Sequence, residues 1–151
     1  MRAEADSEED RERVNTVLPD IDIRSVNDII AGSDLIVLAP GDGETLAGLV
    51  AAGEWRAGQI VLHAGLSNGI SVLAPAQDAG AIVLAVSPVV TFTGTSLDLV
   101  RMRDGYCAIT APAAALPIAQ ALALEMGCEP FVVAEEDRAV FADAVNAVAE
   151  F

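Results

Sequence analysis

Three runs along the chain are apolar at nearly every position: "LIVLA", "IVLHA" and "IVLAV", within Asp34–Pro40, Gln59–Ala64 and Ala81–Ser87. Continuous runs of this kind are typical of strands covered on both faces, whereas half-exposed strands alternate apolar and polar residues. Segments with helical patterning separate the three runs. We therefore expect adjacent parallel strands with helices on each side, the middle run being paired along both of its edges.

The flanking segments continue the alternation of strands and helices. A short strand at Ile21–Ile23 precedes a helix that ends at Gly32, and the charged stretch before them predicts a frayed or solvent-exposed helical N-terminus over residues 1–20. Further helices are expected over residues 44–55, 70–80, 114–127 and 136–151, with strands over residues 105–112 and 129–135. The chain of 151 residues has the length of one α/β domain.

The composition of the chain argues against two classes of binding partner. Hydrophobic residues make up 53% of the chain, enough for a core, and the net charge of −15 with no lysine repels nucleic acid and anionic membranes. No segment has the length of a membrane helix and no apolar leader begins the sequence, so we expect a cytoplasmic protein. Cys107 and Cys128 have no metal-like spacing, and buried free thiols are favoured over a disulfide.

In a parallel sheet flanked by helices, ligands bind beyond the carboxyl ends of the strands. Here those ends are "APGDG", "HAGLSNG" and "SPVVTFTGTS". The first resembles part of a glycine-rich phosphate turn, but Leu46 stands at the third glycine position, and Asp42 and Glu44 would repel phosphate. A tight turn with Glu44 at a helix N-terminus is the favoured interpretation.

The other two loops offer hydroxyls and one imidazole. His63 is the single histidine, which excludes a histidine metal site, and a hydrogen-bonded core role is favoured over catalysis. Gly65 allows close approach of a ligand, while Ser67 and Asn68 either contact a ligand or cap the next helix. Thr91 and Thr93 are hard to explain as helix caps, so a loop that faces a ligand is favoured. Nearby, Arg101 and Arg103 are either solvated or hold a carboxylate, and the solvated alternative is favoured.

The order of "SDLIVLAP", "WRAGQIVLHAG", "GISVLAPAQDAGA", "SPVVTFTGTSLDL" and "EPFVVAEEDRAVFADA" resembles a family of bacterial Rossmann-like, NADP-dependent oxidoreductases with a C-terminal domain of unknown function. That family is related to 6-phosphogluconate dehydrogenase, pyrroline-5-carboxylate reductase and ketopantoate reductase. The resemblance implies an α/β fold with a doubly wound, mainly parallel sheet. It also implies a partial dinucleotide-binding domain over residues 21–100, a βαβ extension over 101–134, and the start of a helical dimerisation domain over 135–151.

The chain departs from the family at both ends. The resemblance implies that the first two strands and the glycine-rich turn between strand and helix are lacking. Where the family has His-Thr-Ser-Gly, this chain has His63, Ala64, Gly65 and Leu66. Ser87 replaces the family's histidine before Pro88, and Phe141 and Ala142 replace a later Tyr-His pair. We therefore expect either a fragment of a longer gene product or a degenerate copy. Binding of NADP, the family's cofactor, is expected to be weak or absent.

The resemblance also implies a set of site residues. Those beside the cofactor are Ala39, Pro40, Gly41, His63, Ala64 and Gly65. Those facing a small-molecule substrate are Ser87, Thr91, Phe92 and Thr93.

Two functions follow as hypotheses. One is a truncated or degenerate NAD(P)-dependent oxidoreductase, whose relatives transfer hydride to a small carbonyl or imine. The other is a non-catalytic binding or assembly module that kept the fold. In both cases an apolar open edge at Asp34–Pro40 and an apolar stripe on the last helix predict a homo-oligomer.

Overall fold

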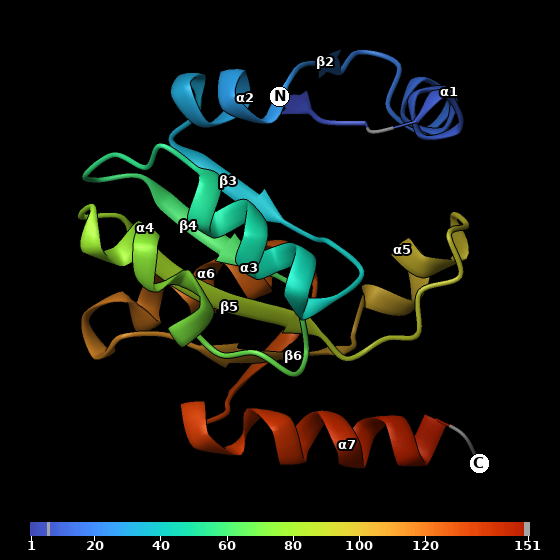
Figure 1. Ribbon diagram of the computed structural model, residues 1–151. Coiled ribbons are helices and arrows are strands. Elements are labelled where there is room, and N and C mark those ends of the chain that lie inside the picture. Colours follow the sequence, from blue (N-terminus) through green and yellow to red (C-terminus); the bar gives the residue numbers. More distant parts are fainter. Residues whose placement is uncertain (6, 150–151) are drawn as a thin grey trace.

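The computed structural model describes residues 1–5 and 7–149 and contains a five-stranded sheet in the order β3-β4-β5-β6-β7 (Figure 1). Its strands are β3 (Leu35–Leu38), β4 (Ile60–His63), β5 (Ile82–Pro88), β6 (Tyr106–Thr110) and β7 (Glu129–Val132). Strands β3, β4 and β5 are parallel neighbours, and β4 pairs with the other two along its two edges. The prediction from the three apolar runs is confirmed.

Strand direction changes once within this sheet. β6 runs antiparallel to β5, with Val86 opposite Ile109, and β7 then runs parallel to β6. The reversal follows from the connection: a loop and the short helix α5 (Leu97–Met102) return the chain at the carboxyl end of β5 rather than carrying it back across the sheet. The sheet is therefore mainly parallel with one antiparallel junction.

The N-terminal part forms a separate two-stranded sheet. Strand β1 (Arg2–Ala3) pairs in parallel with β2 (Asp22–Ile23), and the helices α1 (Glu8–Val17) and α2 (Val26–Gly32) follow β1 and β2. The sequence did not predict β1, because two residues in a charged stretch carry no strand pattern. In Figure 1 this N-terminal layer lies beyond the β3 edge of the larger sheet.

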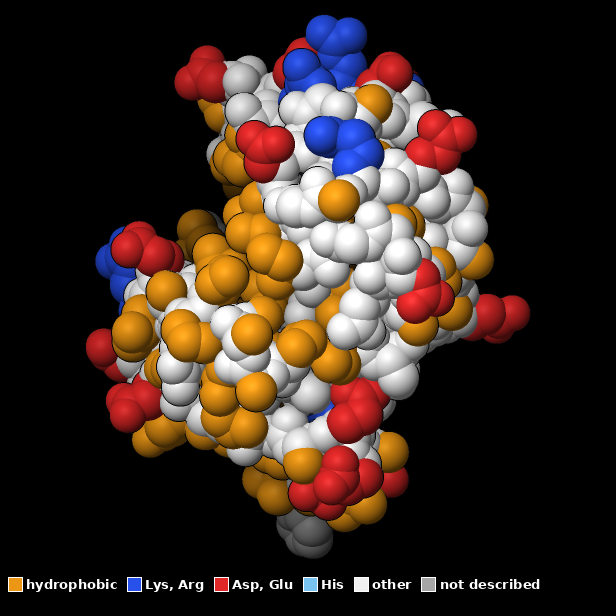
Figure 2. Space-filling model, turned by 90° about the vertical axis from the view of Figure 1, so that its left-hand side faces the viewer, with side chains coloured by type: hydrophobic (Ala, Val, Ile, Leu, Met, Phe, Trp, Pro, Cys, Tyr) orange, Lys and Arg blue, Asp and Glu red, His pale blue; other side chains and the backbone are white. Residues whose placement is uncertain are grey.

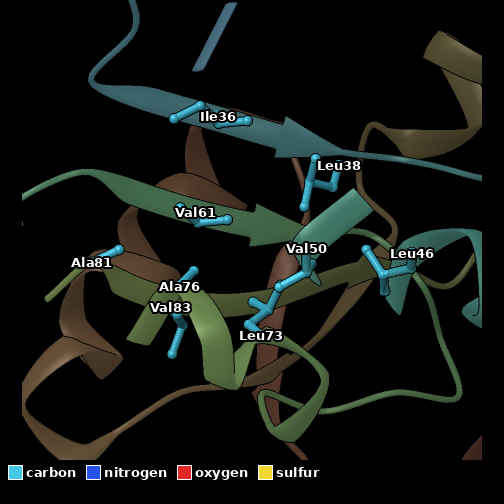
Figure 3. Packing of buried hydrophobic residues seen from close by; sticks show 9 residues of the cluster. All are labelled: Ile36, Leu38, Leu46, Val50, Val61, Leu73, Ala76, Ala81 and Val83. Atoms are coloured by element: carbon cyan, nitrogen blue, oxygen red, sulfur yellow. The ribbon is translucent and has the colours of Figure 1, made fainter. Parts of the chain in front are cut away.

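Helices cover both faces of the larger sheet. Helix α3 (Gly43–Ala52), the 3-10 turn η1 (Ser71–Leu73) and helix α4 (Ala74–Asp78) lie on one face, and α6 (Leu116–Glu125) lies on the other (Figure 1). The side chains beneath α3 and α4 form one apolar cluster, shown in Figure 3. Val50, Val61 and Leu73 are wholly buried there, and burial of each such side chain stabilises the fold by about 1.5–3 kcal/mol.

The last helix, α7 (Arg138–Ala149), follows the 3-10 turn η3 (Glu135–Asp137) and lies beyond β6 in Figure 1. It buries Arg138 and Ala142, whereas Val140 and Val148 on the same helix are 71% and 75% exposed. Within the described residues, no helix is both long enough and apolar enough to cross a membrane. Cys107 and Cys128 are buried free thiols, and burial raises the pKa of Cys107 to about 12.

Candidate functional site

A small pocket of about 130 Å³ lies where β3 and β4 end. Its walls are the loop after β3, the loop after β4 and one side of α7, and it is lined by Pro40, Gly41, Asp42, Gly43, Leu46, Gly65, Leu66, Ser67, Asn68, Ala142 and Asn146. This is the edge at which a doubly wound sheet binds ligands. The volume is below the roughly 300–1,000 Å³ of ordinary ligand pockets, so the pocket admits only part of a dinucleotide.

The protein's own carboxylate already binds one of the amide groups at the start of α3. Asp42 caps this helix: its Oδ1 accepts from the amide of Thr45 at 2.6 Å, and its Oδ2 accepts from the Thr45 hydroxyl at 2.9 Å. These hydrogen bonds hold the pKa of Asp42 below its ordinary value. A phosphate at this helix end would meet the charges of Asp42 and Glu44, so the tight turn rather than a phosphate site is observed.

His63 is fully buried, and both of its ring nitrogens are engaged. The amide of Gly65 donates to Nδ1 at 3.0 Å, so Nε2 carries the proton and donates to the carbonyl of Gly69 at 2.6 Å. Burial lowers the pKa of His63, which keeps the ring neutral. The imidazole therefore shapes the loop after β4 and has no proton directed into the pocket.

A buried arginine from α7 joins the two strands β5 and β6 to this loop. Arg138 is 1% exposed. Its guanidinium donates to Thr110 Oγ1 at 2.7 Å, Ser87 Oγ at 2.9 Å, and the carbonyls of Ala108, Leu66 and Ala85 at 3.0, 3.3 and 3.4 Å. We call this set of contacts the Arg138 clasp. Burial lowers the pKa of Arg138 to about 10, so the group stays charged at neutral pH.

The neighbouring Glu135 holds the same loop from the other end. Its carboxylate accepts from the amides of Ile70 and Ser71 at 2.7 and 3.0 Å. Burial alone would raise the pKa of Glu135, but the hydrogen bonds from Ser71 and Ile70 outweigh it and the pKa is lowered. A side chain at Gly69 would overlap this carboxylate, which gives the Asn68-Gly69 step a structural reason.

The loop after β5 is organised around one carboxylate that the sequence did not single out. Asp98 is 7% exposed and accepts from the amides of Thr93 and Gly94 and from the Thr93 hydroxyl at 2.8–3.0 Å. The Thr93 amide is the main reason that the pKa of Asp98 is lowered. Thr91 and Phe92 remain exposed, and Phe92 is 56% exposed.

Ser87 differs from these exposed neighbours. It is fully buried, and its hydroxyl donates to the carbonyl of Gly65 at 3.0 Å while accepting from Arg138. The predicted substrate residues therefore differ in their surroundings. Ser87 is buried and supports the Gly65 loop, Thr93 belongs to a turn held by Asp98, and Thr91 and Phe92 are exposed. None of them is among the described residues that line the small pocket.

A second and larger cavity, of about 760 Å³, lies between the N-terminal layer and β3. Pro40 and Gly41 line both cavities, Ala39 lines only the larger one, and Gly65 lines only the smaller one. The structure thus brings these four predicted cofactor residues to one edge. His63 and Ala64 lie beneath that edge and line neither cavity as described.

Sequence reasoning missed the three charged residues that hold these loops: Asp98, Glu135 and Arg138. Glu135 and Arg138 stand among other charges in "AEEDRAV", which is typical of a solvated helix start, and Asp98 stands between two leucines. The Asn68-Gly69 step was one signal in the sequence. It indicates that another group packs closely against the backbone there, but it does not identify Glu135 as that group. Every buried side-chain polar atom in residues 1–5 and 7–149 has a hydrogen-bond partner, so none of them needs a ligand to complete its hydrogen bonding.

Residues 1–88 match the family model of the Rossmann-like domain. The chain belongs to that family. No curated protein sequence matches it significantly. The parallel β3-β4-β5 core with its flanking helices is the part of the fold that carries the family's architecture.

Solved structures similar to this Rossmann-like chain include two imine reductases and a reductive aminase. An imine reductase from Myxococcus stipitatus in complex with NADP⁺ is 16% identical, with a TM-score of 0.75 over 99% of this chain and 52% of that one. A reductive aminase from Aspergillus terreus with NADPH and ethyl-5-oxohexanoate is 13% identical, with a TM-score of 0.71 over 99% and 51%. An imine reductase from a Pseudomonas species is 13% identical, with a TM-score of 0.69 over 99% and 52%.

These similarities establish the shared fold. The chain spans about half the length of the solved structures it matches.

Proposed function

We propose that this chain forms the nicotinamide side of the Rossmann domain of an NADP-dependent oxidoreductase. The observation that carries the proposal is the position of Pro40 and Gly41, which line both cavities at the carboxyl end of β3. A Cβ built on Gly41 has no atom within 4 Å, so the backbone there is open to a ligand. The larger cavity, about 760 Å³, has the volume of an ordinary cofactor pocket.

Within this proposal the chain's own residues bind and orient. Ala39–Gly41 and Gly65 present uncharged surface to the nicotinamide ribose, and neutral His63 fixes the Gly65 loop from beneath. Thr91, Phe92 and Thr93 face a small carbonyl or imine substrate, while Ser87 acts through the Gly65 carbonyl. The bound nicotinamide would supply the hydride.

The phosphate end of NADP does not fit the residues described. Asp42 accepts from the Thr45 amide at the start of α3, and Glu44 adds a second negative charge at the same helix end. We therefore expect the chain alone to bind NADPH weakly, with a dissociation constant on the order of 1 mM.

The test is a titration of the ¹⁵N-labelled chain with NADPH, followed by amide chemical shifts. The proposal expects shifts at Gly41 and Gly65. Gly41→Val adds bulk at the pocket without a clash, because no atom lies near its Cβ position, and should weaken NADPH binding fivefold or more. Gly48→Val is the matched control on the exposed side of α3, where the space is equally open, and should leave binding unchanged. Shifts confined to other surfaces would overturn the proposal.

A non-catalytic binding or assembly module is the second candidate. It is favoured by His63, whose two nitrogens are both engaged, so that no imidazole proton is available to a carbonyl. The same titration separates the two candidates. No shift at about 5 mM NADPH, well above the expected constant, supports the module and excludes the cofactor proposal.

We further propose that the protein is cytoplasmic and assembles into a homo-oligomer. Val140 and Val148 expose apolar surface on α7, and such surface on a helix favours association. Light scattering at about 50 µM, a concentration at which micromolar association is visible, should give at least the dimer mass. Val140→Glu combined with Val148→Glu should return the monomer mass, and a monomer in the unaltered chain would contradict the proposal.

A further inference from the structure

The small pocket is bounded by a loop that side chains near the start of α7 hold at both ends. We call residues 65–71 the pocket loop, since four of them line the pocket, and we call η3 with the first turn of α7 the α7 base. Near the start of the loop, Arg138 donates to the carbonyl of Leu66 at 3.3 Å. Near its end, Glu135 accepts from two backbone amides at 2.7 and 3.0 Å. Both holding residues belong to the α7 base.

Ser87 adds an indirect link at the start of the pocket loop. Its hydroxyl accepts from Arg138 at 2.9 Å and donates to the carbonyl of Gly65 at 3.0 Å. His63 joins the start of the loop to its far part, because its ring accepts from the amide of Gly65 and donates to the carbonyl of Gly69. Ser87, His63 and Arg138 are each at most 1% exposed, so water does not compete for these hydrogen bonds.

The α7 base is also packed tightly against the pocket loop. A Cβ built on Gly69 would overlap the Glu135 carboxylate, so a displacement of η3 would displace the loop backbone as well. Ala142 and Asn146, farther along α7, line the same pocket. Helix α7 thus supplies one wall of the pocket, and its base determines the position of another wall.

The contacts of Arg138 do more than attach α7 to the sheet. Of the five acceptors described for its guanidinium, three lie in β5 or β6 and fix the helix to the strands. The other two, the Leu66 carbonyl and the Ser87 hydroxyl, connect the guanidinium to the pocket loop. Both amide contacts of Glu135 also end on the loop. Attachment of α7 requires only the first group, so the remaining contacts indicate a role in the pocket.

The two charges of the α7 base also act on each other. Burial lowers the pKa of Arg138 to about 10, and the nearby Glu135 carboxylate acts in the opposite direction. Loss of the Glu135 charge would make the buried cation less favourable. Neutralising Glu135 should therefore weaken the attachment of the pocket loop at both ends.

We propose that Glu135 and Arg138 are positioning residues for the pocket loop, so that docking of α7 and binding of a ligand in the small pocket are thermodynamically coupled. Neither side chain is among the described residues that line the pocket, and both act through the loop backbone. By reciprocity, a ligand that fixes the loop also fixes the α7 base. The identity of the ligand, the nicotinamide part of NADPH, rests on the proposed function, whereas the positioning of the loop does not.

The single histidine provides a reporter for the pocket loop. The Nε2 proton of His63 is hydrogen-bonded to the Gly69 carbonyl, so its NMR signal and its rate of exchange with solvent depend on the position of the loop. The measurement uses the ¹⁵N-labelled chain at neutral pH without NADPH. Amides of β5 give the rate of global unfolding in the same sample, which separates loop opening from a general loss of stability.

The first matched pair of variants tests the Glu135 end. Glu135→Gln should speed exchange of the histidine Nε2 proton and of the Ile70 and Ser71 amides about tenfold relative to the β5 amides. Glu136→Gln is the control, because it removes the same charge from the next residue, which is exposed. Acidic side chains lie at several separate places on the face shown in Figure 2, so the loss of one exposed carboxylate should change these rates less than about twofold.

The second pair tests the Arg138 end. Ser87 and Thr110 each accept from Arg138, but Ser87 donates onward to Gly65 in the pocket loop and Thr110 donates to Val133, just after β7. Ser87→Ala should shift the histidine signal and speed its exchange. Thr110→Val also removes a buried hydroxyl that accepts from Arg138, and it should leave the histidine signal in place. Equal shifts in the two variants would show that Arg138 acts on stability alone and would overturn its positioning role.

A titration with NADPH tests the coupling itself. Glu135→Gln should weaken NADPH binding about fivefold, whereas Glu136→Gln should leave it unchanged. In the unaltered chain, NADPH should slow exchange at the Ile70 and Ser71 amides. Equal affinities of the two variants, or an unchanged histidine signal in Glu135→Gln, would overturn the proposal. Absence of NADPH binding to the unaltered chain would overturn the proposed function alone, because the histidine signal still decides whether the α7 base positions the loop.

Discussion

Replacement of Arg138 by methionine tests how α7 is held to the sheet. Methionine keeps most of the aliphatic length of the side chain and removes the guanidinium, which makes its closest contacts with Thr110 Oγ1 at 2.7 Å, Ser87 Oγ at 2.9 Å and the Ala108 carbonyl at 3.0 Å. Two longer contacts reach other carbonyls at 3.3 and 3.4 Å. The variant thus removes the Arg138 clasp while leaving the apolar packing of α7 largely in place.

The expected loss follows from opposing contributions. Three well-formed hydrogen bonds from a charged donor contribute about 1.5 kcal/mol each at the low end, or about 4.5 kcal/mol together. Removing the buried charge recovers about 3 kcal/mol of desolvation cost, because burial lowers the pKa of Arg138 to about 10. The acceptors that lose their donor cost about 1–2 kcal/mol in return, because they stay buried. The net destabilisation is about 3 kcal/mol, equivalent to a fall in Tm of about 6–12 °C for a domain of this size.

Urea unfolding followed by circular dichroism measures the change. Arg138→Lys should destabilise the fold by about 2 kcal/mol, less than Arg138→Met does, because an ammonium donates hydrogen bonds but cannot reproduce the planar fork of donors. Arg13→Met is the matched control: its side chain is 59% exposed and makes only long ion pairs at 3.8 and 3.9 Å. That control should change the free energy of unfolding by less than about 0.5 kcal/mol.

A loss below about 1 kcal/mol for Arg138→Met would refute the reasoning. It would mean that the hydrogen bonds of the clasp only offset the cost of burying the charge. An increase in stability would go further and show that an apolar side chain is the better occupant of this position.

Two further substitutions and one pH series test the loops around the pocket. Gly69→Ala should destabilise the fold by about 2 kcal/mol in urea unfolding, because its methyl group would displace the Glu135 carboxylate from the amides it caps. Gly48→Ala, in open space within α3, should instead stabilise it by about 0.5–1 kcal/mol, and equal effects would contradict the argument. The pKa of His63 in the folded chain lies below its ordinary 6.5, so the buried ring is neutral. Its contribution to the free energy of unfolding is therefore complete above pH 6.5. It is lost as the pH falls below that value, because the unfolded chain then binds a proton that the folded chain does not. His63→Gln should therefore flatten the stability profile between about pH 6.5 and 5 relative to the unaltered chain, and parallel profiles would show that His63 does not titrate on unfolding.

The core of the sheet could be predicted from the sequence because its signal is local. The first five residues of β5, "IVLAV", are all apolar, and a short run of this kind is typical of a strand covered on both faces. The strand direction at β6 could not be predicted, because hydrophobicity is the same whichever way a strand runs. β1 was missed because its two residues are held by pairing with β2 and not by their own pattern.

The sequence predicted the edge of the sheet at which the candidate site lies, but not the charged residues that hold its loops. Strand ends marked the edge where Gly41 and Gly65 meet, since parallel strands end together. The partners of Arg138 come from strands separated from it by up to 53 residues and from backbone carbonyls, which have no sequence signature. A charged residue that spans such distances is indistinguishable in sequence from one on a solvated helix.

The division of strands into two sheets has a dynamic consequence. The N-terminal layer is linked to the larger sheet by the short segment between α2 and β3 and by polar contacts such as those from Gln59 to the carbonyls of Ile30 and Ser33 at 2.7 and 3.0 Å. Because no strand in the described residues joins the two sheets, this layer can detach without breaking the hydrogen-bonded ladder of the larger sheet. Local opening should thus expose the linker around Ser33 and Asp34 to limited proteolysis well before global unfolding, leaving a resistant C-terminal fragment.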